Sequence, residues 1–295
     1  MAVKIRCIRE NTGAIRTTAC LGVGFALAFQ AGTVAAAESR QRPVPPEPAV
    51  SYADLADLAD SAPLVLRAQV RRVRVIEGVR LAEPKLGTGR FFIEAKTRAL
   101  IAGPGFAAAD LRYIAALPVN AKGKPPKLSK AEVFLFARSV PGRPGEIQLV
   151  APDAQVIWGP RAETSLRAIL TELAAAEQPP VVTGVREAIH VPGNLAGEGE
   201  TQLFLSTRND SAASITVTHV PGRPPAWSWS FSEVAGAGTQ PPPRETLAWY
   251  RLACFLPAEL PRGAQLSERP QDRDQAQADY RLVLEQLGAC TRLRR

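Results

Sequence analysis

Two histidines are the side chains of this sequence best suited to acid–base chemistry. His190 and His219 are the only histidines in the chain, and an unperturbed imidazole titrates near neutral pH. Either could serve as a general base beside a serine or a carboxylate that the fold brings close. Each also ends an alternating run typical of a strand. This pattern fits a histidine that is packed in the core or at its edge equally well.

The motifs that mark common catalytic and cofactor sites are absent from the sequence. The chain has no G-x-S-x-G elbow, no S-x-x-K set, no P-loop and no dinucleotide fingerprint. Neither histidine has a second histidine or a free cysteine at ligand spacing, so we expect no metal and no cofactor. A hydrolase of cell-envelope material, with His190 or His219 as the base, stays open as an alternative.

Two basic stretches could together bind a polyanion. One follows the first long strand, and the other is the proline-containing loop AKGKPPKLSK (121–130). Such a face binds nucleic acid or oligosaccharide when exposed aromatic rings accompany it. Here Phe91, Phe134 and Phe136 fall in apolar runs that predict burial, so a solvated face is the competing interpretation. The candidate polyanion-binding residues are Arg67, Arg71, Arg72, Arg74, Lys122, Lys124, Lys127 and Lys130.

The run TLAWYRLACFLPAELP (246–261) could be a membrane segment, a segment that carries a reactive cysteine, or a buried helix. Pro257 forbids helix continuation, and residues 246–256 would span only about 16 Å as a helix, far short of a bilayer. An apolar setting also makes a thiol inert. We therefore expect a buried helix. Cys254 should pair with Cys290 in an oxidising compartment, which would contribute about 4 kcal/mol by the chain-entropy model.

The first 37 residues resemble a secretory signal peptide in their layout. A basic region precedes the apolar run ACLGVGFALAFQAG (19–32), and Ala35 and Ala37 supply the A-x-A spacing. We expect cleavage after Ala37, a flexible tail over residues 38–50, and a periplasmic or secreted protein. Because the leader carries four basic residues and one acidic residue, its removal lowers the formal charge from +8 to +5. No second apolar run is long enough to predict a transmembrane segment in the mature chain.

Alternating apolar residues predict a first β-rich domain over residues 51–177. Ser51 and Asp54 form a capping-box pattern that opens a short helix. In the first strand the alternation slips by one residue near Arg71–Arg72, which indicates a β-bulge. Five or six strands, the first long and bent, predict a small closed or half-closed barrel that is OB-like in its strand pattern.

A second β-rich domain is predicted over residues 181–295, beyond a helix at 165–176 and a boundary at Glu177–Pro180. The strand WSWSF (227–231) alternates cleanly, and its aromatic side should face the core. An amphipathic helix over 272–287 should start with a capping box and stop at a glycine. The predicted fold class is therefore mainly β (α+β), with two disulfide-linked C-terminal helices.

Two stretches of the second half, GNLAGEGETQLFL (193–205) and ETLAWYRLACFLPAELP (245–261), are similar to segments of exported bacterial proteins of unknown function. This resemblance implies export, and it implies no activity and no catalytic residue.

The predicted function is that of an exported, non-catalytic binding or interaction protein, because recognisable active-site constellations are lacking. The ligand is not identified by the sequence. We expect the partner to be another envelope protein or an anionic envelope polymer. The alternatives are an envelope hydrolase and a polyanion-binding protein.

Overall fold

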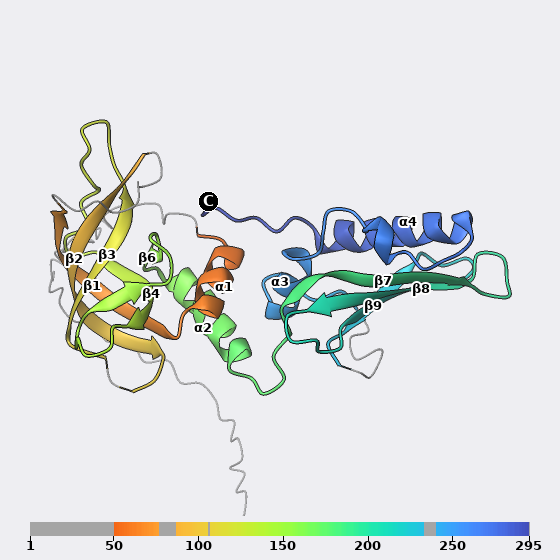
Figure 1. The fold of residues 1–295 in the computed structure, drawn as a ribbon, viewed down its shortest axis with the longest axis horizontal. Helices are drawn as coiled ribbons and strands as arrows, with labels where there is room; N and C mark the ends of the chain where they lie inside the picture. Colours follow the sequence, from red (N-terminus) through yellow and green to blue (C-terminus); the bar gives the residue numbers. More distant parts are fainter. Residues whose placement is uncertain (1–49, 77–86, 106, 233–239, 295) are drawn as a thin grey trace, which may run out of the picture. The chain divides into compact units, whose positions relative to one another are not determined.

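The computed structural model describes residues 50–76, 87–105, 107–232 and 240–294, and its described part is mainly β with two antiparallel sheets (Figure 1). The mainly β fold class is thus confirmed. The predicted leader (1–37) and the predicted tail as far as residue 49 lie outside the described residues. Among the helices that are described, none is long and apolar enough to cross a membrane.

The N-terminal sheet is preceded by a short helix that begins as predicted. The Ser51 hydroxyl accepts a hydrogen bond from the Asp54 amide, and the Asp54 carboxylate accepts one from the Ser51 amide, both at 3.1 Å. This capping box satisfies two amides that the first helical turn leaves free. The elements of this half are α1 (Tyr52–Ser61), β1 (Leu64–Val75), β2 (Thr88–Ala102), β3 (Asp110–Pro118), β4 (Glu132–Ser139), β5 (Ile147–Leu149), β6 (Gln155–Ile157) and α2 (Pro160–Leu173).

The predicted β-bulge in β1 is present. Val70 pairs with Ala95 and Arg72 pairs with Glu94, so Arg71 is the extra residue between two consecutive pairs. The bulge keeps Val73 on the same face as the buried Ile93, while Arg72 turns to the opposite face. The slip in the sequence pattern therefore marks a real change of register.

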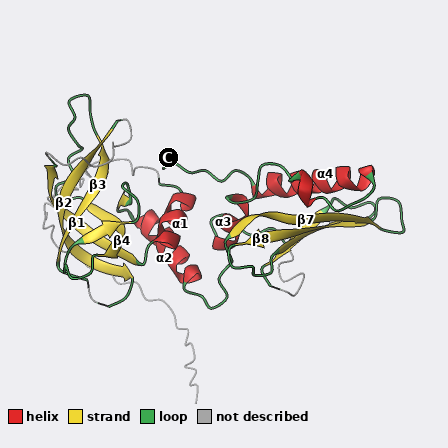
Figure 2. Cartoon of the chain, in the orientation of Figure 1, coloured by secondary structure: helices red, strands yellow, loops and turns green. Residues whose placement is uncertain are grey.

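The first half was expected to form a closed or half-closed barrel, and its sheet is open and does not show a closed barrel. The sheet runs β3-β2-β1-β4, and both β5 and β6 pair with β4, end to end along its free edge. Between the far edges, the described residues make one parallel bridge, Arg112 with Glu146, and two backbone hydrogen bonds, from the Arg112 amide to the Gly145 carbonyl and from the Ala116 amide to the Pro152 carbonyl. Because β5 has three residues, it is too short to build the continuous ladder that barrel closure needs. The sheet stays open, and α1 and α2 pack against each other beside it (Figure 2).

The C-terminal sheet is an antiparallel meander in the order β10-β9-β8-β7. Asp210, at a φ of 57°, lies in the turn between β8 and β9, where an aspartate tolerates the left-handed conformation. Figure 1 shows α4 running along this sheet, and α4 packs against β7 and β8. The elements of this half are β7 (Val182–Pro192), β8 (Gly199–Thr207), β9 (Ser214–His219), β10 (Ala226–Ser230), α3 (Leu247–Ala253), the 3-10 helix η1 (Arg262–Ala264) and α4 (Pro270–Leu287).

The start of α4 differs from the predicted capping box. The helix begins at Pro270, two residues earlier than expected, because proline is preorganised for the first helical position. The Asp272 carboxylate instead accepts hydrogen bonds of 2.7 and 3.1 Å from the Arg269 guanidinium. At the other end Gly288, at a φ of 69°, stops the helix as predicted.

The apolar run 246–261 forms the buried helix α3 and carries one half of a disulfide bond. Thr246 caps α3 through its hydroxyl, which accepts from the Trp249 amide. Cys254 follows the last helical residue and is bonded to Cys290, with 5.1 Å between the two Cα atoms. The disulfide therefore ties the end of α3 to the residues after α4. Cys254 is therefore not a free reactive thiol in this structure.

Candidate functional site

The fold brings the two histidines together although they lie on strands that are not neighbours. His190 is on β7 and His219 is on β9, with β8 between them, and their ring centres are 6.1 Å apart. Both face Asp279 of α4, a carboxylate that is only 2 % exposed. His219 Nε2 lies 2.8 Å from Asp279 Oδ1, and His190 Nδ1 lies 2.8 Å from the Thr201 hydroxyl, which donates to Asp279.

Asp279 is the acceptor at the centre of this histidine–aspartate cluster. Its two oxygens accept from the Thr201 hydroxyl, from His219 and from the Gln275 amide at 2.9 Å. A buried carboxylate with this many donors has its hydrogen-bonding capacity satisfied. Burial lowers the pKa of His190, and the nearby Asp279 carboxylate opposes that shift. A neutral His190 can then donate Nδ1–H to Thr201, which fixes its tautomer.

Gly199 makes room for the cluster. It pairs with His219 across the β8–β9 ladder, and a Cβ at this position would lie 2.8 Å from His190 Cε1. A side chain there would displace the His190 ring and disrupt its hydrogen bond with the Thr201 hydroxyl. The GEGE segment that contains Gly199 therefore has a packing role that its sequence did not reveal.

The cluster lies between α4 and the C-terminal sheet. Thr201 is fully buried at its centre, and its proton is directed at Asp279. Neither of the two pockets described below includes either histidine in its lining. Within the described ranges, no group of three or more histidine, cysteine, aspartate or glutamate residues is arranged to hold a metal ion. What the cluster does is join α4 to β7, β8 and β9.

The predicted polyanion-binding residues lie in different surroundings. Arg67 is held inward: its guanidinium donates to Glu163 at 3.1 Å and lies over the Trp158 ring at 5.2 Å. Arg72 and Arg74 reach the outer face of β1, where both approach Glu94, at 3.8 and 3.3 Å. Arg71 is exposed at the bulge.

The lysines of the 121–130 loop are a separate group. Lys122, Lys124, Lys127 and Lys130 are all exposed. The Asn120 side chain orders the loop by accepting from the amides of Lys122 and Lys124 at 2.9 and 3.0 Å. Lys130 pairs through its backbone with Val70, so the end of the loop adjoins the bulge of β1.

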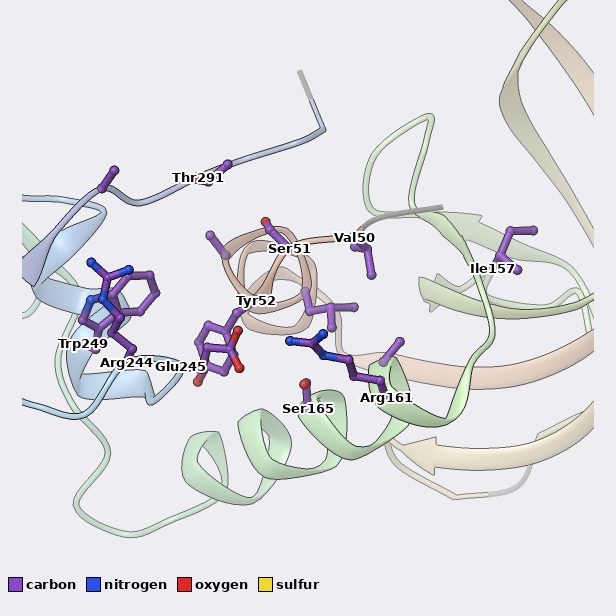
Figure 3. Close-up of a pocket in the computed structure, with 14 residues that line it drawn as sticks. Val50, Ser51, Tyr52, Ile157, Arg161, Ser165, Arg244, Glu245, Trp249 and Thr291 are labelled. Carbon is purple, nitrogen blue, oxygen red and sulfur yellow. The ribbon is translucent and has the colours of Figure 1, made fainter. Parts of the chain in front are cut away.

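The larger of the two described pockets lies among α1, α2, α3 and the chain after α4 (Figure 3). We call it the helical pocket. Its volume is about 620 Å³, within the range of small-molecule sites. The described residues belong to one compact unit, so all walls of the pocket belong to the same body. The lining residues are Val50, Ser51, Tyr52, Ala53, Leu55, Ile157, Arg161, Ala162, Ser165, Arg244, Glu245, Trp249, Ala289 and Thr291.

Two aromatic rings form one wall of the helical pocket. Tyr52 and Trp249 meet edge to face with ring centres 6.2 Å apart. Trp249 is held by a hydrogen bond from its indole N–H to the Leu287 carbonyl at 2.9 Å. The Tyr52 hydroxyl is buried and has no hydrogen-bond partner in the part of the chain that the structure describes. Burial, followed by the charges of Glu172 and Glu245, raises the pKa of Tyr52, so this hydroxyl stays protonated.

Two exposed arginines complete the helical pocket. Arg161 belongs to the first turn of α2 and extends toward Tyr52 in Figure 3. Arg244 precedes α3 and lies against Gly288 so closely that a Cβ there would collide with its guanidinium. Neither arginine has a carboxylate partner among the described residues. The lining also holds one acidic side chain, Glu245, whose backbone has a φ of 59°.

Sequence reasoning missed the helical pocket entirely. Its polar residues come from four separate segments, and no two of them form a recognisable motif. The apolar run around Trp249 was predicted as core, and this is correct, because every residue from Leu247 to Leu252 is buried. The two arginines gave no usable signal, because Arg161 is followed by Glu163 and Arg244 by Glu245 in the sequence. No protein-family model matches the chain, and no curated protein matches it either.

Proposed function

We propose that this chain is an exported, non-catalytic binding protein whose ligand is a small organic anion held in the helical pocket. The observation that carries the proposal is the pairing of two unpartnered arginines with a buried aromatic wall in one hollow. Ligand sites in proteins are mostly apolar, with a few polar groups that fix orientation. The helical pocket has this composition.

The chemistry of the lining points to a carboxylate with an apolar body. A guanidinium presents a planar fork that matches a carboxylate in two parallel hydrogen bonds. Tyr52, Trp249 and Leu55 offer apolar surface to the rest of the molecule. Glu245 leaves the pocket with a net charge of one positive unit and could accept from a hydroxyl or an ammonium group of the same ligand.

Binding fits the geometry better than hydrolysis. The two histidines meet a carboxylate, yet they do so around a buried threonine and outside both described pockets. Export rests on the predicted leader and on the Cys254–Cys290 bond, which is compatible with an oxidising compartment.

A panel of matched ligands tests the proposal. Calorimetric titration of the purified mature chain would compare indole-3-acetate, benzoate and hexanoate with their neutral amides. We expect the acids to bind and the amides to bind at least tenfold more weakly. Arg161→Ala with Arg244→Ala should abolish binding of the acids.

The control removes the same charge elsewhere. Arg208 and Arg223 are exposed and form no ion pair with the described residues, so their double alanine variant should bind the acids unchanged. Equal binding of acids and amides, or no acid binding by the wild-type chain, would overturn the proposal.

A further inference from the structure

A second basic surface lies on the outer face of the open N-terminal sheet. Residues paired directly across antiparallel strands point to the same side. One row across the sheet is therefore Arg72, Glu94 and Arg112, and the next is Arg74, Phe92 and Ile114. We call these two rows, together with Arg90 of the following row, the β1–β3 outer face.

This face is turned away from the core. The residues that alternate with it on β3, Tyr113 and Ala115, are 2 % and 0 % exposed, whereas Ile114 is 45 % exposed. Phe92 is half-buried on the same outer side. Antiparallel sheets commonly leave one face to water, and that face is normally polar throughout. Here arginines alternate with apolar side chains, which is a composition suited to contact with another molecule.

The face continues into a hollow between β3 and β5. Its volume is about 550 Å³, and Arg90, Phe92, Arg112, Arg143 and Glu146 are among its lining residues. The hollow lies where a closed barrel would have joined β3 to β5 along a full ladder. The failure of closure thus creates a concave surface at the end of a basic face.

The arginines of this surface outnumber its carboxylates. Arg72 and Arg74 share Glu94, at 3.8 and 3.3 Å. Arg112 and Arg143 share Glu146, at 3.9 and 3.3 Å. Exposed pairs of this kind contribute little to stability, so an incoming anion can replace the glutamate as partner.

Arg90 stands apart from these pairs. It is half-buried and has no carboxylate partner among the residues described. Five arginines against two glutamates leave the surface with three excess positive charges.

We propose that the β1–β3 outer face and its hollow bind an acidic polysaccharide. The positive charges are spread over three strands and the segment before β5, so a linear chain with repeated anionic groups can meet all of them. Phe92 is the one aromatic ring among the rows named, whereas single-stranded nucleic acid is held by several rings on which successive bases stack. The carbohydrate chain is therefore the better match. This site is separate from the helical pocket.

Binding to size-defined heparin and to oligogalacturonate tests the proposal, with neutral dextran and a thymidine 20-mer as comparison ligands. The wild-type chain should bind both acidic glycans, more tightly than the 20-mer, and should not bind dextran. Affinity should fall steeply with salt concentration, because bound counterions are released. Arg90→Ala with Arg112→Ala should weaken binding at least tenfold and make the salt slope shallower by about two.

A second double variant separates this surface from net charge. Lys124→Ala with Lys127→Ala removes the same charge from the 121–130 loop and should change glycan affinity less than threefold. Thermal unfolding would verify that both variants fold, and Arg72→Ala with Arg74→Ala supplies an alternative pair on the face. Equal losses in the arginine and lysine variants, a flat salt dependence, or tighter binding of the 20-mer would overturn the proposal.

Discussion

The guanidinium of Arg251 in α3 lies fully buried against the carboxylate of Asp60 in α1. Nη2 is 2.8 Å from Oδ1 and Nη1 is 3.0 Å from Oδ2, while the Arg251 side chain is 1 % exposed. Nε also donates to the Pro179 carbonyl at 3.2 Å. The one charge in the apolar run 246–256 is thus neutralised by a residue nearly two hundred positions away, and this pair joins the first helix to the third.

Removing the acidic partner should destabilise the protein strongly. Asp60→Ala leaves a buried arginine without its counter-charge, and such changes typically cost about 3–5 kcal/mol. Urea unfolding followed by circular dichroism would measure the loss. The exposed pair Arg269–Asp272 is the matched control: Arg269→Ala should cost less than about 1 kcal/mol. Similar costs for the two variants would contradict the role of the buried pair.

The disulfide should add stability by restricting the unfolded chain. Replacing Cys254 and Cys290 by serine is expected to lower the free energy of unfolding by about 2–4 kcal/mol. Because the tail after Cys290 is also held by Arg292, which donates to Asp57 at 2.6 Å, the variant should still fold. Thermal unfolding with and without a reductant checks this: a reductant should lower the midpoint of the wild type and leave the variant unchanged.

Stability should depend on the protonation of His190. Burial lowers its pKa in the folded state, the carboxylates of Asp279 and Asp272 oppose that shift, and the charges of His219 and Arg269 reinforce it. The unfolded chain therefore takes up a proton first as the pH falls below the ordinary histidine value of about 6.5. Stability contributed by the neutral imidazole is present above that pH and is lost as the pH falls toward the folded pKa.

Substitution of this histidine should flatten the pH response. His190→Gln should lose less free energy of unfolding than the wild type between pH 7.5 and pH 5. Urea unfolding curves at both values give the comparison. Parallel losses in the two proteins would show that other groups govern the acid response.

The lone hydroxyl of Tyr52 offers a fourth test. Tyr52→Phe removes a buried donor that has no partner among the described residues, so the ligand-free protein should keep its stability or gain up to about 1 kcal/mol. Tyr113→Phe is the control, because its hydroxyl donates to Gln155 at 2.6 Å, and its loss should cost about 1 kcal/mol. A destabilised Tyr52→Phe variant would mean that this hydroxyl has a partner in solution.

Local features of this protein were open to prediction because they depend on residues close in sequence. The Ser51–Asp54 capping box, the bulge at Arg71 and the stop at Gly288 each involve a few neighbouring positions whose backbone geometry is set by their own side chains. The pairing of Cys254 with Cys290 followed from counting the cysteines that remain once a leader is removed.

The sites were decided by the tertiary structure. Asp279 meets His190 and His219 only because α4 lies on β7, β8 and β9, and nothing near Asp279 in the chain marks it as their partner. Arg161 and Arg244 meet at one hollow because two helices and a turn from separate segments pack together. The open sheet likewise reflects the shortness of β5 against the edge of β3. Local backbone geometry is determined by the side chains of a few neighbouring residues. The meeting of distant residues depends instead on strand register and on the packing of whole elements.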